Sequence, residues 1–421
     1  MKNFDVIVIG AGAAGLLAAG RAAECGGNVL VLEKMRRAGR KLLITGKGRC
    51  NITNNAPVSE FIKHIQPNGK FLRNAFSQFF SKEIIDLLQQ HGTEVTLERG
   101  GRYFPTSNKS ADVLNALLKW VSELNVEIHC GEKVEKIVVE DNQVRGVFSN
   151  GKFIQADRVI LATGGKSYPA TGSTGDGYEL AKQVGHSLVP DRPALVPLET
   201  RGDVAQKLQG LNLKNAKAVV WVNGKKAGED FGEMVFTHFG LSGPVILTLS
   251  RIVVDELQKK NKVEITIDLK PALDEQKLDN RLIRDLNEHG KKKLGNIFRH
   301  WLPLAMIPVF IELLEIDTEK ECHQVSAVER KKIRYLLKNL RFEITGHRSY
   351  KEAIITAGGI PTKEIYPKSM ESKFIKGLYF AGEVIDLDAK TGGYNLQIAW
   401  STGWVAGNAC KSHLLFSTQT G

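Results

Sequence analysis

The stretch from Asp5 to Gly15, Asp-Val-Ile-Val-Ile-Gly-Ala-Gly-Ala-Ala-Gly, constrains the fold more than any other part of the chain. Its apolar start is dominated by Val and Ile, as in a strand of a parallel sheet that is buried on both faces. Glycines at the G-x-G-x-x-G spacing follow directly and open a helix, which we expect from about Ala13 to Cys25. Gly10 permits the tight turn, Gly12 lets the backbone approach a pyrophosphate, and Gly15 lets the helix pack on the strand. The pattern predicts a bound dinucleotide, with its pyrophosphate at the helix N-terminus.

A second apolar strand is expected at residues 28–32, and it ends at Glu33. An acid about twenty residues beyond the glycines accepts hydrogen bonds from the ribose of a bound dinucleotide. A glycine triplet alone also occurs in ordinary tight turns, but here the flanking strand, the helix and the acid all agree. Cations follow with no acid among them: Lys34, Arg36, Arg37, Arg40, Lys41, Lys47 and Arg49. We expect some of them to face cofactor phosphates or an anionic substrate.

Composition narrows the class of protein. The 421 residues are 42% hydrophobic, which is typical of a globular chain of about two or three domains. No apolar run is long enough to span a bilayer and no secretion signal opens the chain, so we expect a cytoplasmic protein without membrane contact. The cysteines are scattered and never form C-x-x-C, which argues against a metal site, a disulfide scaffold or a dithiol pair: Cys25, Cys50, Cys130, Cys322 and Cys410. The net charge of +12 indicates either a solubility charge or an anionic partner.

The first half of the chain alternates helical and irregular segments. Residues 42–53 contain too many Gly and polar residues for a helix and start too apolar for a free surface loop, so we expect a loop laid against a flat ring system. Residues 59–90 and 110–124 have helical patterns, separated by a turn at 98–107. Residues 127–162 alternate like an antiparallel meander that ends in Thr-Gly-Gly.

Prolines near residue 190 mark a boundary, and the pattern changes after it. A hairpin is expected around Asn223-Gly224, a strand at 263–269, and helices from about 274 to 340. The last of these helices begins with a capping box at 326–329.

The C-terminal part returns to the pattern of the first domain, since residues 353–360 resemble the earlier strand that ends in Thr-Gly-Gly. A buried strand is expected at 376–386, ending at Asp386, and Gly392-Gly393 opens a helix that runs to about 409. We therefore expect a discontinuous cofactor domain, residues 1–190 plus 346–421, around a β-rich insert at 191–271 and a helical insert at 272–345.

FAD explains this C-terminal part better than NAD does. An FAD extended along the sheet would place its adenosine near Gly10 and Glu33 and its ribityl hydroxyls near Asp386. The backbone N–H groups from Gly393 to Leu396, with a helix dipole behind them, would stabilise the negative charge that reduction places on the N1/O2 edge of the flavin. A solvated turn is the alternative for Glu383 and Asp386.

Several blocks together resemble one bacterial flavoprotein family, typified by BaiN and YhiN and often called the aminoacetone oxidase family of FAD-binding enzymes. These blocks are the glycine motif with Glu33, and residues 46–53, 102–107, 236–244, 356–359, 380–383 and 391–395. The resemblance covers nearly the whole chain. It implies an α/β fold: a Rossmann-like FAD-binding domain of the two-dinucleotide-binding type with an inserted β-barrel-like part and a helical part. It also implies an NAD(P)H-linked oxidoreductase, distantly similar to fumarate-reductase-type flavoproteins.

Pattern and resemblance together predict the FAD-binding residues. They are Gly10, Gly12, Ala14, Gly15, Glu33, Lys34, Arg40, Lys41, Gly46, Gly48, Arg49, Cys50, Asn51, Val134, Thr163, Gly164, Gly359, Gly382, Glu383, Asp386, Gly392, Gly393, Tyr394, Asn395 and Leu396.

Two departures refine this interpretation. Only one G-x-G-x-x-G is present, so NAD(P)H has no second Rossmann domain and must enter transiently, in the cleft where the substrate later binds. Lys47 stands where the family is expected to have the middle residue of Gly-Gly-Gly, which adds a cation near the flavin.

The expected chemistry is hydride transfer from NAD(P)H to flavin N5, and then to the β-carbon of a conjugated carbonyl in a small molecule. Arg102, Tyr168, His238 and Cys50 are the candidate catalytic residues. His238 fits a packing histidine equally well, and Cys50 fits a side chain packed on the ring better than a nucleophile.

Two other classes of function stay open. An RNA-modifying flavoenzyme could reduce the uracil 5,6 double bond, which is itself conjugated to a carbonyl, while basic residues contact phosphates. A flavin-binding protein without turnover, acting as a sensor or scaffold, is the third class.

Overall fold

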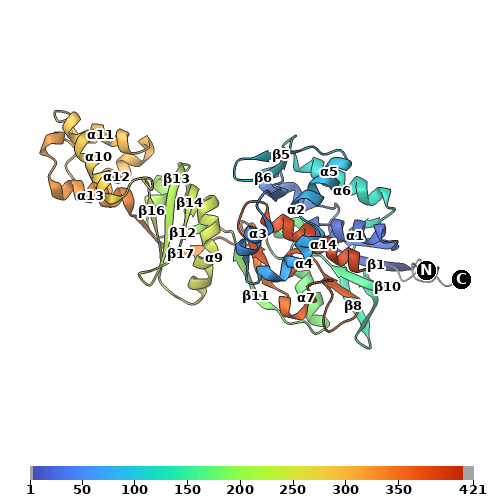
Figure 1. Cartoon of the computed structure of the whole chain (residues 1–421). Coiled ribbons are helices and arrows are strands. Elements are labelled where there is room, and N and C mark those ends of the chain that lie inside the picture. Colours follow the sequence, from blue (N-terminus) through green and yellow to red (C-terminus); the bar gives the residue numbers. More distant parts are fainter. Residues whose placement is uncertain (1–2, 411–421) are drawn as a thin grey trace. The chain divides into compact units, whose positions relative to one another are not determined.

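The structure, a computed structural model, describes residues 3–410 and divides into two compact units (Figure 1). One unit comprises the chain up to Pro193 together with the part from Ile354 onward, and the other comprises Ala194–Ala353. The ends of the chain therefore build one unit together, and the second unit is inserted between them. The division into three domains expected from the sequence stays a prediction.

A mostly parallel sheet organises the first unit. Its strands are β1 (Phe4–Ile9), β2 (Val29–Glu33), β7 (Glu127–Cys130), β8 (Val134–Glu140), β9 (Gln143–Ser149), β10 (Lys152–Leu161) and β19 (Leu378–Phe380). The order is β7-β2-β1-β10-β9-β8, with β19 also paired to β10. The pairs of β1 with β2 and β10, of β2 with β7, and of β10 with β19 are parallel, whereas β8, β9 and the start of β10 pair antiparallel. This is the Rossmann-like α/β arrangement that the sequence predicts.

The first unit also contains eight helices among the described residues. They are α1 (Ala13–Glu24), α2 (Arg40–Ile44), α3 (Val58–His64), α4 (Arg73–Gln78), α5 (Ser81–Gln90), α6 (Ser110–Glu123), α7 (Asp176–Gln183) and α14 (Tyr394–Ala409). Short strands complete the unit: β3 (Thr53–Asn54), β4 (Ile65–Gln66), β5 (Val95–Glu98), β6 (Arg102–Pro105), β11 (Val189–Ala194), β18 (Ile355–Gly359) and β20 (Asp388–Ala389).

Four expectations for this unit were wrong in detail. The segment 42–53 begins inside helix α2 and is not a loop throughout. Residues 59–90 form three short helices with β4 between the first two. The first strand expected in the meander, β7, pairs parallel with β2 at the sheet edge. The strand expected at 376–386 is only β19, because Gly382 takes a left-handed φ of +76° and starts a 3-10 turn.

The second unit contains a closed barrel of six strands in the order β12-β15-β14-β13-β16-β17. The strands are β12 (Leu198–Thr200), β13 (Asn212–Val222), β14 (Lys225–Thr237), β15 (Gly240–Ser242), β16 (Val263–Asp268) and β17 (Leu340–His347). The unit's helices are α8 (Val204–Lys207), α9 (Pro244–Gln258), α10 (Glu275–Glu288), α11 (Leu294–Trp301), α12 (Ile307–Leu314) and α13 (Ala327–Lys338). Barrel and helices share one hydrophobic cluster. The expected hairpin at Asn223-Gly224 and the capping box between Ser326 and Glu329 are both present.

None of the helices in the described residues 3–410 has both the length and the apolar character needed to cross a membrane.

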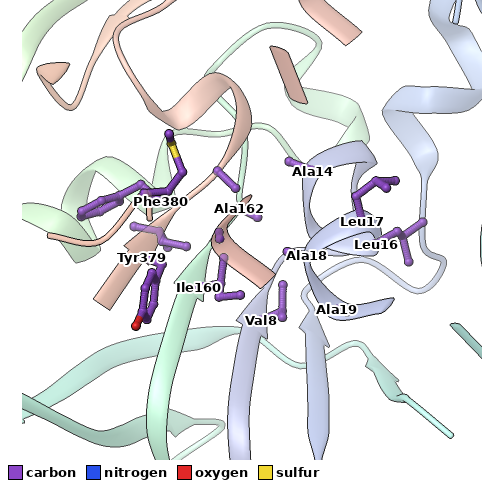
Figure 2. Close-up of a cluster of buried hydrophobic side chains, with 14 of the residues drawn as sticks. Val8, Ala14, Leu16, Leu17, Ala18, Ala19, Ile160, Ala162, Tyr379 and Phe380 are labelled. Atoms are coloured by element: carbon purple, nitrogen blue, oxygen red, sulfur yellow. The ribbon is translucent and has the colours of Figure 1, made fainter. Parts of the chain in front are cut away.

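Glycines let α14 pack directly on the backbone of α1. A Cβ added to Gly403 would lie 2.3 Å from the carbonyl oxygen of Ala14, and one added to Gly407 would lie 2.4 Å from that of Ala18. Figure 2 shows Leu16, Leu17 and Ala18 of α1 in one cluster of buried hydrophobic side chains with residues of β1, β10 and β19. Helices from opposite ends of the chain thus form one buried layer above the sheet.

We expect Gly403→Ala and Gly407→Ala each to lower the free energy of unfolding by about 1–3 kcal/mol, because the added methyl group meets backbone that cannot move aside. The better helix propensity of Ala, about 1 kcal/mol, would favour the opposite result. Thermal unfolding followed by circular dichroism measures the difference. Gly295→Ala in α11 is the matched control, since its added Cβ has no neighbour nearer than 3.5 Å. Equal midpoints for all three variants would contradict the close packing.

A buried histidine joins the end of α7 to the C-terminal segment. His186 Nδ1 lies 2.9 Å from Glu364 Oε2, and its Nε2 lies 2.8 Å from Ser372 Oγ. Burial lowers the pKa of His186, while the contact with Glu364 opposes that effect. Burial raises the pKa of Glu364, but hydrogen bonds from Ser187 and His186 outweigh this, so its pKa also falls below the usual value. Because both pKa values are lowered, folding disfavours the protonation of His186 and of Glu364.

Acid should weaken this unit through His186. Its folded pKa lies below the ordinary value of 6.5, so the unfolded chain takes up the proton first as pH falls. The stabilisation is complete above about pH 6.5 and is lost as pH falls from there toward the folded pKa. Thermal midpoints recorded between about pH 7.5 and 5.5 should fall less steeply for His186→Gln than for the unsubstituted chain. Equal slopes for His186→Gln and the unsubstituted chain would reject His186 as the cause.

Candidate flavin site

The three motif glycines answer different steric demands. Gly10 has φ +102°, and a Cβ on it would lie 2.7 Å from Ala162 O at the end of β10. A Cβ on Gly15 would lie 1.8 Å from Gly10 O. A Cβ on Gly12 would have no protein atom within 4 Å. Packing of the chain itself explains Gly10 and Gly15, whereas the open space at Gly12, in front of the N-terminus of α1, fits an approaching pyrophosphate.

Glu33 holds the glycine loop by hydrogen bonds from backbone N–H groups. Its Oε2 accepts the backbone N–H of Ala11 at 2.9 Å, and its Oε1 accepts that of Met35 at 2.8 Å. The next residue, Lys34, pairs with Asp176 at 2.6 Å. The expected contact of Glu33 with a ribose stays a prediction, and the structure adds a role in holding the turn.

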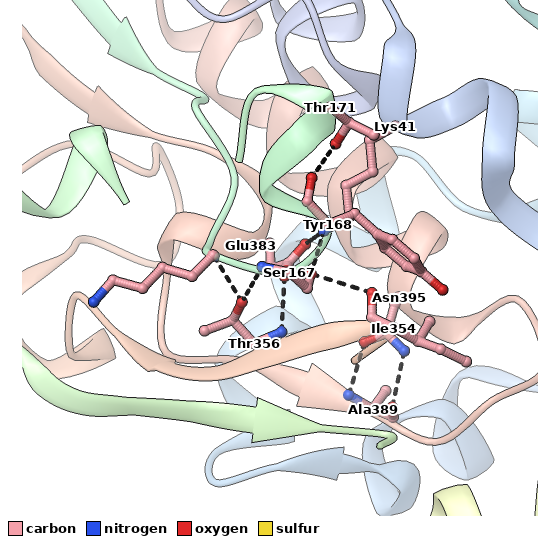
Figure 3. A network of polar contacts seen from close by, with 10 residues as sticks. Lys41, Ser167, Tyr168, Thr171, Ile354, Thr356, Glu383, Ala389 and Asn395 are labelled. Atoms are coloured by element: carbon pink, nitrogen blue, oxygen red, sulfur yellow. Dashed lines mark hydrogen bonds and ion pairs between the residues drawn. The ribbon is translucent and has the colours of Figure 1, made fainter. Parts of the chain in front are cut away.

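A partly buried ion pair joins three segments that are far apart in the sequence (Figure 3). Lys41 Nζ lies 2.6 Å from Glu383 Oε2 and 2.6 Å from Ser167 Oγ. Glu383 Oε1 accepts hydrogen bonds from Ser167 Oγ at 2.9 Å and from Thr356 N at 2.8 Å. The solvated turn considered for Glu383 does not occur. We call Lys41, Ser167, Thr356 and Glu383 the polar cluster.

Sequence reasoning missed two members of the polar cluster, Ser167 and Thr356. Both follow or lie within strand ends of the Thr-Gly-Gly kind, at 163–165 and 356–359, and the likeness of those two ends was the available signal. Thr356 Oγ1 accepts the N–H groups of Lys166 and Ser167, at 2.8 and 3.1 Å. The two strand ends are therefore tied to each other directly.

Buried polar groups also lie at the strand ends. Thr163 Oγ1, just after β10, is buried and has no hydrogen-bond partner among residues 3–410. A buried hydroxyl without a partner is costly, and a polar ligand would satisfy it. Gly164 next to it takes φ +74°. Asp386 is 6% exposed, and its own N–H donates to Ile360 O at 2.8 Å. Together with the open space at Gly12, these groups fit a dinucleotide along the carboxyl ends of the strands.

The loop after α2 is held in an unusual backbone conformation. Gly46, Lys47, Gly48 and Cys50 all have positive φ, at +56°, +58°, +83° and +59°. For Lys47 and Cys50 this is strained, and such strain is concentrated at functional sites. Cys50 is fully buried, and burial raises the pKa of its thiol to about 12. The thiol therefore keeps its proton at neutral pH, which disfavours the thiolate that a nucleophile needs.

Neighbouring side chains lock this loop in place. Arg49 lies over the Phe104 ring, 4.1 Å from its centroid, and pairs with Glu98. The Asn51 amide accepts the N–H of Gly393 at 3.0 Å when its oxygen faces the N-terminus of α14. That N–H is then occupied, which leaves the next ones along the helix for a ligand.

The N-terminus of α14 is pressed against the loop. A Cβ on Gly393, which has φ +97°, would lie 2.5 Å from Thr53 O. Asn395 closes the preceding turn, accepting from Ala389 N at 2.9 Å and donating to Ala389 O at 2.8 Å (Figure 3). Tyr394 is buried, with its ring edge-on to Phe61.

The remaining predicted residues fall into place as follows. Arg40 is exposed in α2, Val134 is buried at the start of β8, and Gly359 ends β18. Ala14 lies in α1, where a Cβ on Gly382 would approach its methyl group to 2.8 Å. Gly392 and Leu396 flank the start of α14.

The candidate catalytic residues are spread over both units. Tyr168 is half-buried with a left-handed φ of +52°, directly after Ser167 of the polar cluster. Arg102 is exposed on β6, and its Nε donates to Arg99 O at 3.1 Å. His238 is exposed in the second unit, edge-on to Phe239. Cys50 and Tyr168 thus belong to the same unit as the glycine loop, whereas His238 does not.

A glycine loop on β1, with buried polar groups at the strand ends beside it, defines a Rossmann-type flavin-dependent oxidoreductase. The chain belongs to the HI0933-like family: residues 4–409 match the HI0933-like protein Rossmann domain. This confirms the flavoprotein family inferred from the sequence.

Relatives with an assigned activity match the chain over nearly its full length. A 3-dehydro-bile acid delta(4,6)-reductase from Clostridium scindens is 33% identical over 96% of this chain and 98% of its own. A ribosomal RNA dihydrouridine synthase from Escherichia coli is 31% identical over 99% of both chains. Among solved structures, the Mycobacterium smegmatis Sdh1 complex in the apo form has a TM-score of 0.50 and 19% identity, covering 97% of this chain and 68% of that one.

Two glycine substitutions should separate cofactor binding from folding. Gly12→Val adds atoms to open space at an ordinary φ of −84°, so the fold should keep its thermal midpoint while the purified protein loses its flavin absorbance. Gly15→Val places its side chain on Gly10 O and should lower the yield of folded protein. Flavin released by denaturation, measured per mole of protein, checks the first variant. Full flavin content in Gly12→Val would show that the pyrophosphate does not lie at this loop.

Proposed function

We propose that the protein uses FAD to reduce a carbon–carbon double bond conjugated to a carbonyl, with NAD(P)H as the electron donor. One observation carries this proposal: the two reactions named for the near-full-length relatives share that step. A delta-4,6 bond system beside a 3-oxo group and the 5,6 bond of uracil both place the alkene next to a carbonyl. Hydride adds to the β-carbon, the electron pair moves onto the carbonyl oxygen, and a proton then adds to the α-carbon.

Bound FAD would accept and donate the hydride at N5. The chain's own residues position the flavin and control protons. The N-terminus of α14 would direct the N–H groups of its first turn and its dipole toward the N1/O2 edge of the flavin. The polar cluster holds the surrounding segments in one arrangement before substrate arrives. Cys50, protonated at neutral pH, and Tyr168 are the proposed holders of the proton for the α-carbon.

The electron donor has no dedicated domain. One glycine motif serves the FAD, so NAD(P)H is proposed to bind transiently in the space that the substrate occupies later. The two half-reactions would then alternate at one face of the flavin.

A small-molecule enone is the first candidate substrate. The bile acid reductase, at 33% identity, acts on a compound of this kind. Arg102 is exposed on β6, and its Cζ lies 5.8 Å from the centroid of the Phe104 ring. It is a candidate for holding an anionic substituent of such a molecule.

Uridine in ribosomal RNA is the second candidate substrate. Two relatives are named ribosomal RNA dihydrouridine synthases, and the Haemophilus influenzae enzyme is 30% identical over 94% of this chain. The net charge of +12 is an independent observation in favour of a polyanionic substrate.

Anaerobic stopped-flow spectroscopy tests the proposal. NADPH or NADH should bleach the flavin absorbance, and an acceptor should restore it. Reoxidation by a conjugated enone would identify the small-molecule reductase. Reoxidation by ribosomal RNA lacking dihydrouridine, with dihydrouridine then detected by mass spectrometry, would identify the RNA enzyme.

The same assay tests the proton donors. Tyr168→Phe and Cys50→Ala should bleach at the normal rate, and loss of the donor should slow reoxidation by about 10²-fold or more. If neither NADPH nor NADH bleaches the flavin, NAD(P)H is not the electron donor. If neither the enone nor the RNA reoxidises the reduced flavin, the proposed reduction is wrong.

A further inference from the structure

A pocket of about 880 Å³ lies within the second unit, away from the glycine motif in sequence. Its walls come from β13, β14, the segment 269–273 and α10. Lys217 of β13 is paired in register with Phe231 of β14, so the two side chains share a face of the barrel sheet. Neighbouring Ala216 and Ala218 are buried in the barrel, which places Lys217 and Phe231 on its outer face.

The cations Lys270 and Arg281 line this pocket, and Arg281 shares its ion-pair partner Asp285 with Arg284. Arg281 Nε is buried without a hydrogen bond among residues 3–410, and Asp285 Oδ2 lies 3.6 Å away. That carboxylate is already bound by Trp301 Nε1 at 2.9 Å and by Arg284 at 3.1 Å. Lys270 forms no ion pair within the described part of the chain. Burial lowers the pKa of Lys270, and the charge of Arg281 lowers it further. An anion between these two side chains would relieve their repulsion.

The two acids of the pocket lining, Glu229 and Asp230, do not form ion pairs with Lys270 or Arg281. Glu229 is bridged by Lys217 at 2.6 Å and by Lys226 at 2.9 Å, so its charge is compensated. Asp230 accepts the N–H of Phe231 at 2.9 Å. Among residues 3–410, Lys270 therefore has no ion pair, Arg281 has only the shared carboxylate of Asp285, and Asp230 is the acid of the lining that no ion pair neutralises.

An aromatic ring completes the pocket. Phe231 is 58% exposed, although a ring of this size is usually buried. Exposed aromatic rings next to cations are the combination by which proteins hold a nucleotide, since the base stacks on the ring and the phosphate pairs with Arg or Lys.

We propose that this pocket binds a nucleotide, with its phosphate between Lys270 and Arg281 and its base on Phe231. The site goes beyond the proposed reduction, and it does not depend on which double bond the flavin reduces. The nucleotide belongs either to an RNA strand or to a free mononucleotide, and both present the same phosphate and base.

Binding to the full-length, flavin-loaded protein tests the site. One arm uses fluorescence anisotropy with an end-labelled single-stranded RNA of about ten nucleotides at several salt concentrations. The other arm uses calorimetric titration with AMP and with adenosine. Lys270→Ala and Arg281→Gln should each weaken binding about tenfold and reduce its salt dependence. Phe231→Leu, which keeps an apolar side chain, should weaken it about tenfold through lost stacking. Lys331→Ala, an exposed lysine of α13, is the matched control and should bind normally.

The two arms distinguish the source of the nucleotide. RNA binding that depends on the pocket residues, without AMP binding, assigns the pocket to an RNA strand. AMP binding that exceeds adenosine binding and depends on the same residues, without RNA binding, assigns it to a free nucleotide. No binding of either probe, or equal binding by the pocket variants and Lys331→Ala, would overturn the proposal. Unchanged thermal midpoints verify that the variants fold, and flavin bleaching by NADPH in the same preparations reports the reductase separately.

Discussion

The first unit depends on close contacts between backbone segments, at glycines where no side chain would fit. Gly15 lies on Gly10, Gly403 on Ala14 and Gly407 on Ala18, so α1 and α14 pack at backbone distance above β1. The N-termini of both helices then belong to one rigid layer. One N-terminus faces the open space at Gly12, and the other abuts the strained loop that contains Cys50. Two helix dipoles, each able to stabilise negative charge, are thereby placed in the unit that contains the glycine motif.

The polar cluster adds electrostatic constraint to this packing. Lys41 and Glu383 are each only about one-fifth exposed, with side-chain exposures of 22% and 20%. Removing one partner from a buried pair costs as much as about 3–5 kcal/mol, and partial exposure reduces that cost. Because Ser167 and Thr356 donate to the same carboxylate, three chain segments share a single arrangement. Such pre-organisation is what a hydride-transfer site requires, since reacting atoms must be held in position.

Local patterns predicted the regular parts of the fold well. The strand, glycine turn and helix at the N-terminus, helix α6 and the hairpin at Asn223-Gly224 all occur where periodicity and turn residues placed them. The errors lie where tertiary contacts override local preference. Residues 42–44 are helical because α2 packs against α6 through Gly39 and Leu114, and the strand expected to reach Asp386 stops early at Gly382, whose added Cβ would meet Ala14. Neither contact partner is near in sequence.

The order of residues was enough to establish the cofactor class, because a dinucleotide site depends on a strand, three glycines and an acid that are neighbours along the chain. It also indicated that both ends of the chain share one unit. Only the folded structure brought Lys41, Ser167, Thr356 and Glu383 into contact, buried Cys50, and left Lys270 without an ion pair in the described part of the chain. Hydrogen bonds, desolvation and charge compensation act over a few ångströms of space, and these distances are decided by packing between segments far apart in the sequence.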